Sequence, residues 1–274
     1  MQFKALCTDI DGTLLDKNRE ISARTIDAIA QLPADFPVIL ASSRMPSAMR
    51  HLQADMNRLQ NPMICYNGGY IIHFNGREDE IERLDTVKIP LDICHHIQQL
   101  SVGTDIHVSV YHEDEWYAPK DDFWTQREIT STKVKPIIKK WQHVMPDWES
   151  RQAGAHKVMC MGPAEEIDGL FKALEDQKNE ALHLYRSKDT YIEIAPKSIS
   201  KASALEQLLA KKYNIALSEV IAFGDNYNDI EMLKAAGHGV AVGNARDEVK
   251  AVANEITAGN KEDGVAMMIE KYLL

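Results

Sequence analysis

Cysteine is scarce in this sequence, as are the features that mark secreted or membrane-spanning chains. The four cysteines, Cys7, Cys65, Cys94 and Cys160, lie far apart without a C-x-x-C pair, so we expect buried reduced thiols rather than disulfides. No apolar run approaches the roughly 18 residues of a membrane span. The first residues lack a basic segment followed by an apolar stretch and a cleavage site. We therefore expect a cytoplasmic protein without a membrane partner.

Basic clusters are also missing. The chain has 31 Lys and Arg against 41 Asp and Glu, a formal net charge of −10, and no run of five basic residues, which argues against nucleic acid as a partner. Its 274 residues, 45% of them hydrophobic, can bury one large core or two of ordinary size. We expect two domains in a monomer or weak homo-oligomer.

The first 66 residues alternate short apolar runs with helical patterns, which is typical of a parallel sheet with crossover helices. The expected elements are strand Phe3–Thr8, a helix from N-cap Ser22 to about Leu32, strand Pro37–Ala41, a helix from Pro46 towards Leu59, and strand Met63–Tyr66. The pair Asn75-Gly76 then predicts a hairpin between Tyr70–Phe74 and a strand ending at Leu84.

The pattern changes to a separate α+β type from about Thr86 to Lys188, a stretch that holds all four tryptophans. We expect the first alternation to resume at strand Tyr191–Ile194 and to continue through helix Lys201–Tyr213 and strand Val220–Phe223. The sequence therefore predicts a doubly wound parallel α/β core made of residues 1–84 and 190–274. An α+β domain of residues 85–189 is inserted in it.

Two carboxylates, Asp9 and Asp11, stand where the first apolar strand gives way to a loop containing Gly12. Ligands of open α/β sheets bind outside the carboxyl ends of strands, and residues two apart on a strand point the same way. Asp9 could attack phosphorus to form an aspartyl phosphate, while Asp11 protonates the leaving oxygen and then deprotonates water. Alone, such a pair is more often structural, or a cap of the next element, than catalytic.

A carboxylate that approaches a phosphate needs cations, because each pair of like unit charges repels by roughly 4 kcal/mol at about 4 Å and a dielectric near 20. A second acidic cluster, Gly224 to Asp229, directly follows the predicted strand Val220–Phe223. Oxygen ligands from Asp9, Asp225 and a backbone carbonyl would suit Mg²⁺. A Ca²⁺ loop fits less well because its downstream Gly and Glu spacing is absent.

Together these segments resemble the haloacid dehalogenase superfamily and, within it, the Cof-like sugar phosphatases with an inserted type II cap. The likeness covers nearly the whole chain. The first motif of the family, D-x-D-G-T, is matched by Asp9 to Thr13, and the fourth, G-D-x-x-N-D, by Gly224 to Asp229.

The second and third motifs are matched with changes. Ser42-Ser43-Arg44 stands where the family has Thr or Ser followed by Gly-Arg, so Ser43 replaces a glycine. Lys201 stands in a run that resembles G-V-S-K-G, although Ser198 and Ala202 replace its glycines. Lys201 alone could be read as a solvated lysine in the first turn of a helix. Asn67-Gly68-Gly69 corresponds to a family turn near the site or is simply a tight turn.

The resemblance implies a role for each matched position. The implied catalytic residues are Asp9, Asp11, Ser42 and Lys201; the substrate-binding residues are Ser42, Ser43, Arg44, Lys201 and Asn228; the metal-binding residues are Asp9, Asp11, Asp225 and Asp229.

The expected function is that of a Mg²⁺-dependent phosphatase, a phosphoric monoester hydrolase, acting on a small phosphorylated metabolite. A sugar phosphate is the substrate that the resemblance implies. A phosphomutase of the same superfamily is the nearest rival, and it would need a bisphosphorylated activator. A non-catalytic sensor of phosphorylated metabolites is the alternative from another class, but a sensor has no need for Asp11.

Overall fold

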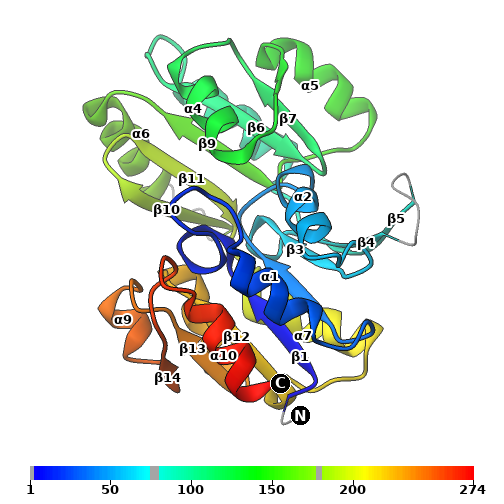
Figure 1. Ribbon diagram of the computed structural model, residues 1–274. Helices are drawn as coiled ribbons and strands as arrows, with labels where there is room; N and C mark the ends of the chain where they lie inside the picture. Colours follow the sequence, from blue (N-terminus) through cyan, green and yellow to red (C-terminus); the bar gives the residue numbers. More distant parts are fainter. Residues whose placement is uncertain (1–2, 75–79, 177–180) are drawn as a thin grey trace. The chain divides into compact units, whose positions relative to one another are not determined.

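The computed structural model describes residues 3–74, 80–176 and 181–274. The chain forms two compact units, each with one sheet (Figure 1). The first comprises Met1–Arg44, Met49–Thr86 and Ile199–Leu274, and the second comprises Met45–Ala48 and Val87–Ser198. The first unit is therefore built from segments far apart in the sequence.

The sheet of the first unit has eight strands in the order β14-β13-β12-β1-β2-β3-β4-β5. Neighbouring strands are parallel from β14 to β3, and β4 and β5 continue the sheet antiparallel. The bounds are β1 (Ala5–Thr8), β2 (Val38–Ala41), β3 (Met63–Cys65), β4 (Tyr70–Phe74), β5 (Ile81–Thr86), β12 (Val220–Gly224), β13 (His238–Ala241) and β14 (Glu255–Ile256). This sheet confirms the predicted α/β class.

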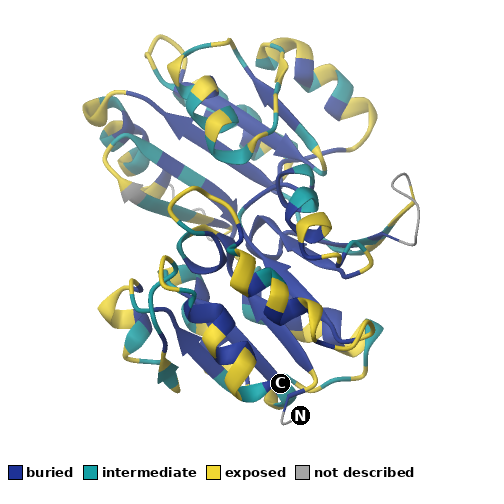
Figure 2. Ribbon diagram, in the orientation of Figure 1, coloured by how far each residue is buried: buried dark blue, intermediate teal, exposed yellow. Residues whose placement is uncertain are grey.

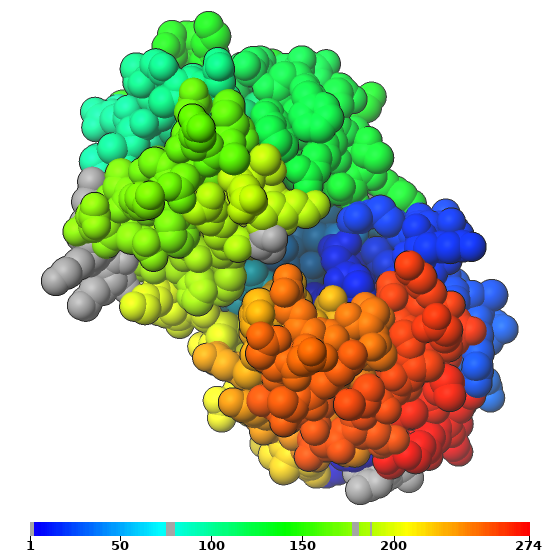
Figure 3. All heavy atoms as spheres, turned by 90° about the vertical axis from the view of Figure 1, so that its left-hand side faces the viewer, coloured from blue at the N-terminus to red at the C-terminus, as the bar shows by residue number. Residues whose placement is uncertain are grey.

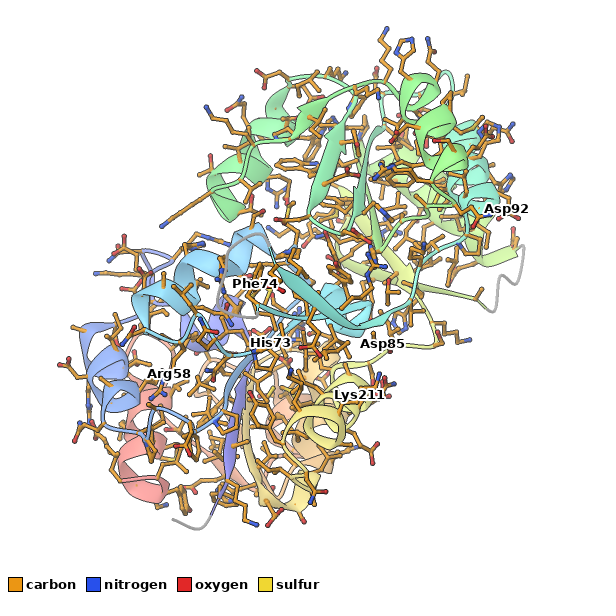
Figure 4. All side chains as sticks on the ribbon, turned by 90° about the vertical axis from the view of Figure 1, so that its right-hand side faces the viewer. Arg58, His73, Phe74, Asp85, Asp92 and Lys211 are labelled. Carbon is orange, nitrogen blue, oxygen red and sulfur yellow. The ribbon has the colours of Figure 1, made fainter. Side chains whose placement is uncertain are left out.

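Helices lie on both faces of this sheet, with α1 and α10 on one face and α7 on the other (Figures 1 and 4). The predicted N-cap of α1 is confirmed, since the Ser22 hydroxyl accepts a hydrogen bond from the Thr25 backbone N–H. The bounds are α1 (Ala23–Ala30), α2 (Ser47–Asp55), α7 (Lys201–Lys212), α8 (Ile230–Ala235), α9 (Asp247–Lys250), α10 (Gly264–Tyr272) and the short turns η1 (Ile10–Leu14), η2 (Tyr66–Gly68), η3 (Leu217–Glu219) and η4 (Tyr227–Asp229).

The hairpin of β4 and β5 confirms the predicted break in the alternation, although its turn pair Asn75-Gly76 lies outside the described residues. Two lysines of α7 hold it: Lys211 Nζ donates to the Leu84 carbonyl at 2.6 Å, and Lys212 Nζ lies 2.6 Å from Glu82 Oε2 (Figure 4). The edge of the sheet is thereby tied to the helix that carries Lys201.

Arg58 fixes the C-terminal end of α1. This buried side chain, labelled in Figure 4, donates from its guanidinium nitrogens to four carbonyls, those of Ile29, Leu32, Pro33 and Ala34, at 2.8–3.0 Å. Helix ends leave such carbonyls without partners inside the helix. Arg58 therefore satisfies the end of a helix that covers the sheet.

The second unit has a six-stranded sheet in the order β10-β11-β9-β6-β7-β8, antiparallel except for the last pair. One face packs on helices α3, α5 and α6 through a core that includes Val110, Trp148, Val158 and Ile192. The bounds are α3 (Leu91–Leu100), β6 (His107–His112), β7 (Glu115–Ala118), α4 (Phe123–Thr132), β8 (Ile137–Ile138), α5 (Trp141–Ser150), β9 (Lys157–Met161), α6 (Ala164–Asp176), β10 (Leu182–Lys188) and β11 (Tyr191–Pro196).

The predicted place of strand Tyr191–Ile194 is wrong. We expected it to resume the first sheet, but β11 pairs with β9 and β10 in the second sheet. Its buried residues Ile192 and Ile194 alternate with the less buried Tyr191 and Glu193, as in a strand with one covered face. The return to the first unit comes later, at Ile199.

Burial follows the two sheets (Figure 2), whose strands are mostly buried while the helices expose their outer faces. The four cysteines are buried and free, which confirms the expected reduced thiols. The described residues include no helix that is both long and apolar enough to span a membrane. In the space-filling view of Figure 3, the segment that follows β12 forms a continuous part of the first unit's surface, coloured orange to red.

Candidate active site

Asp9 occupies the carboxyl end of the central strand β1. Its backbone N–H donates to the Phe223 carbonyl of β12 at 3.0 Å, so the parallel pairing of the two strands fixes where it stands. Its side chain is buried. Oδ1 accepts a hydrogen bond from Lys201 Nζ at 2.5 Å, whereas Oδ2 is buried without a hydrogen-bond partner among the described residues. One oxygen of the Asp9 carboxylate thus accepts a hydrogen bond, and the other accepts none from the described residues.

Lys201 is the first residue of α7, yet it is fully buried, so its alternative reading as a solvated lysine is wrong. Ser200 caps this helix through a reciprocal pair of bonds with Ser203. Lys201 Nζ lies 2.7 Å from Asp229 Oδ1 as well as close to Asp9. Burial alone would lower the pKa of Lys201, but the negative charges of Asp229 and Asp9 raise it, so the ammonium stays charged.

The acidic loop begins where β12 ends. Asp229 Oδ2 accepts from the backbone N–H groups of Asp225 and Asn226, each at 3.0 Å, which closes the loop on itself. Gly224 makes this approach possible, because a Cβ there would lie 2.4 Å from the Cβ of Asp229. Asp225 Oδ1 accepts from the Thr13 hydroxyl at 3.0 Å. The loop is therefore joined to the segment that follows Asp9.

Carboxylate oxygens of Asp9, Asp225 and Asp229 lie within 4.8 Å of one another. In this cluster one ammonium, that of Lys201, faces three carboxylates, which leaves two negative charges uncompensated. Burial, together with the charge of Asp229, raises the pKa of Asp225 to about 6, and burial raises that of Asp9 well above its usual value. The arrangement is thus short of positive charge by the amount that one divalent cation carries.

Asp11 points elsewhere. Its carboxylate accepts from Arg44 Nε and Nη2 and from Arg19 Nη2, each at 2.7 Å. Burial favours a higher pKa, but the hydrogen bonds and charge of Arg44, with Arg19, hold the pKa of Asp11 below its usual value. The sequence grouped Asp11 with the metal-binding acids, and its carboxylate lies outside the cluster of Asp9, Asp225 and Asp229 among the described residues.

The loop after β2 joins the site through Asn67. The Asn67 N–H donates to the Ser42 carbonyl at 2.8 Å, and its side-chain oxygen accepts from Asn228 Nδ2 at 3.0 Å. Asn67 adopts a left-handed conformation with φ of +57°, which asparagine tolerates better than most residues. Ser42 is buried and Ser43 is partly exposed. Ser42 and Asn228, two predicted phosphate-binding residues, are thereby linked through the backbone and the side chain of one residue, Asn67.

The turn of Asn67-Gly68-Gly69 also packs on the lysine helix. Gly68 has φ of +110°, and a Cβ there would lie 2.7 Å from the Ser200 carbonyl. A side chain would therefore push α7 away and move Lys201. The segment is a tight turn, which was one of the two interpretations of its sequence, and it lies beside Ser200 at the start of α7.

Arg19 was missed by the sequence analysis. It returns to Asp11 because Leu15 and Ile21 form an antiparallel bridge, and the intervening turn is closed by Asp16 N–H donating to the Glu20 carbonyl at 2.9 Å. Nothing in the spacing of Arg19 alone indicates that contact. Arg44 was expected to bind substrate. Its guanidinium also pairs with the Asp11 carboxylate, a contact that the sequence did not predict.

Residues 6–269 match the family model of the haloacid dehalogenase-like hydrolases. The chain belongs to this family. The resemblance predicted from the motifs is therefore confirmed over nearly the whole chain.

The relatives of this hydrolase include named phosphatases. A putative phosphatase from Haemophilus influenzae is 32% identical over 99% of this chain and 98% of its own. The 5-amino-6-(5-phospho-D-ribitylamino)uracil phosphatase YitU of Bacillus subtilis is 28% identical over 97% and 96%. The pyridoxal phosphate phosphatase YbhA of Escherichia coli is 28% identical over the full length of both. This hydrolase is a phosphatase.

Solved structures give the same fold. A haloacid dehalogenase-like hydrolase from Bacteroides thetaiotaomicron superposes with a TM-score of 0.86 at 28% identity, covering 98% of this chain and 99% of its own. A protein from Thermotoga maritima superposes with a TM-score of 0.85 at 27% identity, covering 98% and 97%. The core with its inserted domain is thus shared over the full length.

Proposed function

We propose that this phosphatase is Mg²⁺-dependent and removes phosphate from a small phosphorylated metabolite, of the sugar phosphate class, through an aspartyl phosphate on Asp9. The observation that carries the proposal is the divided environment of Asp9. Lys201 holds Oδ1, while Oδ2 is buried with no hydrogen-bond partner among the described residues. An oxygen without a hydrogen-bond donor keeps its lone pairs available for attack on phosphorus.

The residues present fit a magnesium ion. Asp9, Asp225 and Asp229 offer the hard oxygen ligands that Mg²⁺ prefers, and their two uncompensated charges match its own. Asp9 and Asp225 would hold the ion, with Asp229 beside them or shaping the loop. When bound, the ion would neutralise charge on the phosphoryl oxygens. Asp11, which the resemblance also assigned to the metal, would take part through its proton chemistry instead.

In the first step, Asp9 Oδ2 attacks phosphorus and the bond from phosphorus to the ester oxygen breaks. Asp11 gives its proton to that oxygen, which leaves as an alcohol. In the second step, Asp11 takes a proton from water, whose oxygen attacks the phosphoryl group and releases phosphate and the Asp9 carboxylate. Because Arg44 and Arg19 favour the carboxylate form of Asp11, proton donation requires Asp11 to leave part of these contacts when substrate binds.

Four residues are proposed to hold the transferring phosphoryl group. Lys201 brings a buried positive charge, and the Ser42 hydroxyl and Asn228 amide would donate hydrogen bonds to its oxygens. The Ser42 hydroxyl accepts the Arg44 N–H at 3.3 Å, which leaves its own proton for a ligand. Ser43 would contribute through its backbone. Together they would supply the positive charge and donors that a phosphate dianion needs.

The metabolite class is proposed from the relatives, whose names describe phosphate esters of small metabolites, and the sugar phosphate is what the motif resemblance implies. The second unit, Val87–Ser198, is proposed to select among them, as a specificity domain inserted in the catalytic core.

Phosphate release tests the proposal directly. The purified chain would be given a panel of phosphorylated sugars, vitamin precursors, pyridoxal phosphate and nucleotides, with Mg²⁺ and then with chelator. We expect release that needs Mg²⁺ and disappears in Asp9→Asn, a change that keeps the shape of the side chain but removes the nucleophile. Release by Asp9→Asn at a tenth of the original rate or more would refute Asp9 as nucleophile.

The intermediate needs its own test. Acid quenching during turnover of a substrate labelled in its phosphate should trap label on the protein, and hydroxylamine should remove it because an acyl phosphate is cleaved by that nucleophile. Asp9→Asn should trap none. Label that resists hydroxylamine would exclude an aspartyl phosphate while leaving the phosphatase activity intact.

A further inference from the structure

Two asparagines outside the family motifs hold the turn that carries Asp11. Asn244 Nδ2 donates to the Gly12 carbonyl at 2.7 Å, and Asn260 Nδ2 donates to the Leu15 carbonyl at 2.6 Å. The Asn260 N–H donates to Asn244 Oδ1 at 2.8 Å. The loops that follow β13 and β14 therefore grip both ends of the segment 12–15.

This turn needs outside support. Within Ile10–Leu14, Asp11 (φ −82°, ψ 110°) and Gly12 (φ 89°, ψ −5°) leave helical geometry, and the bond from Leu15 N–H to the Ile10 carbonyl at 3.1 Å closes the turn. A Cβ on Gly12 would lie 2.5 Å from Asp225 Oδ2, so the backbone here touches the acidic cluster. A small shift of Gly12 would therefore move Asp11 relative to Asp9 and Asp225.

We propose that Asn244, oriented by Asn260, is a positioning residue: it fixes the Gly12 carbonyl and so sets where Asp11 stands relative to Asp9. This inference rests on the proposed function and adds two residues to it. An amide suits the place because it both donates and accepts, and Asn244 uses its NH₂ on Gly12 and its oxygen on Asn260. A carboxylate at position 244 could not donate to the Gly12 carbonyl.

Because Asn244 is exposed, the effect of a substitution on catalysis can be distinguished from its effect on stability. The side chain lies at the surface, so its hydrogen bonds should contribute little to global stability. A catalytic effect that greatly exceeds the effect on unfolding would be the mark of positioning, because a small misplacement of a reacting group slows turnover more than it weakens binding.

The experiment compares Asn244→Ala, Asn260→Ala, the double variant and the control Asn254→Ala. Asn254 is an exposed asparagine that also bonds to a backbone group, with Oδ1 accepting the Gly239 N–H at 2.7 Å, but at the other end of β13. Hydrolysis of p-nitrophenyl phosphate with Mg²⁺, thermal melting and amide hydrogen exchange of the segment 10–15 would be measured on each.

We expect kcat to fall roughly 5- to 20-fold in Asn244→Ala, with KM changed less than about twofold. The segment 10–15 should exchange faster while the melting temperature stays within about 2 °C of the original. The loss in the double variant should be smaller than the product of the single losses because the two residues act as a unit. Asn244→Asp, which keeps the shape and the acceptor, should be at least as impaired as Asn244→Ala.

Three results would overturn the inference. These are kcat within twofold of the original in Asn244→Ala, an equal loss of kcat in Asn254→Ala, and full activity in Asn244→Asp, which would leave the amide only a space-filling role. If the original chain released no phosphate, the proposed function would fail by itself. Hydrogen exchange would then decide alone whether Asn244 holds the turn, and unchanged exchange in Asn244→Ala would reject it.

Discussion

Replacing Lys201 with methionine should destabilise the first unit severely. Lys201 Nζ lies 2.5 Å from Asp9 Oδ1 and 2.7 Å from Asp229 Oδ1, and the three side chains are almost entirely buried. Removing one partner of a buried ion pair typically costs about 3–5 kcal/mol, because the other charge is left without compensation. Two carboxylates lose their partner here, so we expect a loss near the upper end, about 5 kcal/mol in the free energy of unfolding.

The loss should deepen as pH rises. Without the ammonium, the pKa of Asp9, already raised by burial, would rise further. The native state would then keep a proton that the unfolded chain releases above a pH of about 4, so stability falls as pH rises beyond that value. Protonation below it would relieve part of the repulsion. The variant should therefore be closest to the original in acid.

Urea unfolding in the presence of chelator, followed by circular dichroism, would measure the difference. Lys212→Met is the matched control, since Lys212 lies on the same helix and pairs with Glu82 but is partly exposed. Such a pair contributes at most about 1 kcal/mol. If Lys201→Met lost no more stability than Lys212→Met, the buried cluster would not be held by charge as the structure indicates.

Three further predictions concern folding and loop geometry. Arg58→Met should lower the free energy of unfolding by about 3–5 kcal/mol in urea titration, because four carbonyls lose their donor and those of Ile29 and Leu32 are buried; a loss under about 1 kcal/mol would contradict this. Burial lowers the pKa of His107 although Asp122 opposes the shift. The unfolded chain therefore binds a proton at higher pH than the folded chain, and the free energy of unfolding should fall as pH drops below about 6.5. His107→Gln should reduce this dependence on pH, and an unchanged dependence would exclude His107 as its source. Gly224→Ala should abolish phosphate release and lower the melting temperature, since its Cβ would lie 2.4 Å from Asp229 Cβ; full activity would show that the acidic loop can move aside.

The sequence predicted the elements whose signals are local. Strand Tyr70–Phe74 has the predicted bounds, strand Val220–Phe223 is longer by one residue, and Ser22 caps α1 as expected. Asp9 and Asp225 could be placed together because each directly follows an apolar strand, and parallel strands end at the same edge of a sheet.

Other elements of the second unit had no clear local signal. Helix α5 contains Pro146 in its interior, a residue that normally marks a helix end. Helix α4 is rich in polar and β-branched residues, with only Thr125 fully buried, so it shows little helical periodicity. Strand β8 has only two residues, and both are exposed. Tertiary contacts, rather than propensity, decide these elements.

The contacts of the site followed the same division. The family motifs contain Asp11 and Arg44, but their mutual bond depends on how two loops meet, and no spacing predicts it. Asn244 and Asn260 have no motif to mark them, because each acts through a backbone carbonyl of a distant segment. Sequence patterns identify the reacting residues, whereas the side chains that orient them are brought together only by the fold.

The order of strands in the first sheet bears on how this chain folds during synthesis. The central strand β1 is made first, yet its neighbour β12 begins at Val220. The second unit, almost wholly continuous from Val87 to Ser198, has its partners complete well before that point. Contacts between distant segments form slowly, and domains of a growing chain fold as units. We therefore expect the inserted unit to fold on the ribosome while β1, whose neighbour β2 is already made, still lacks its second neighbour β12, and phosphatase activity to appear last.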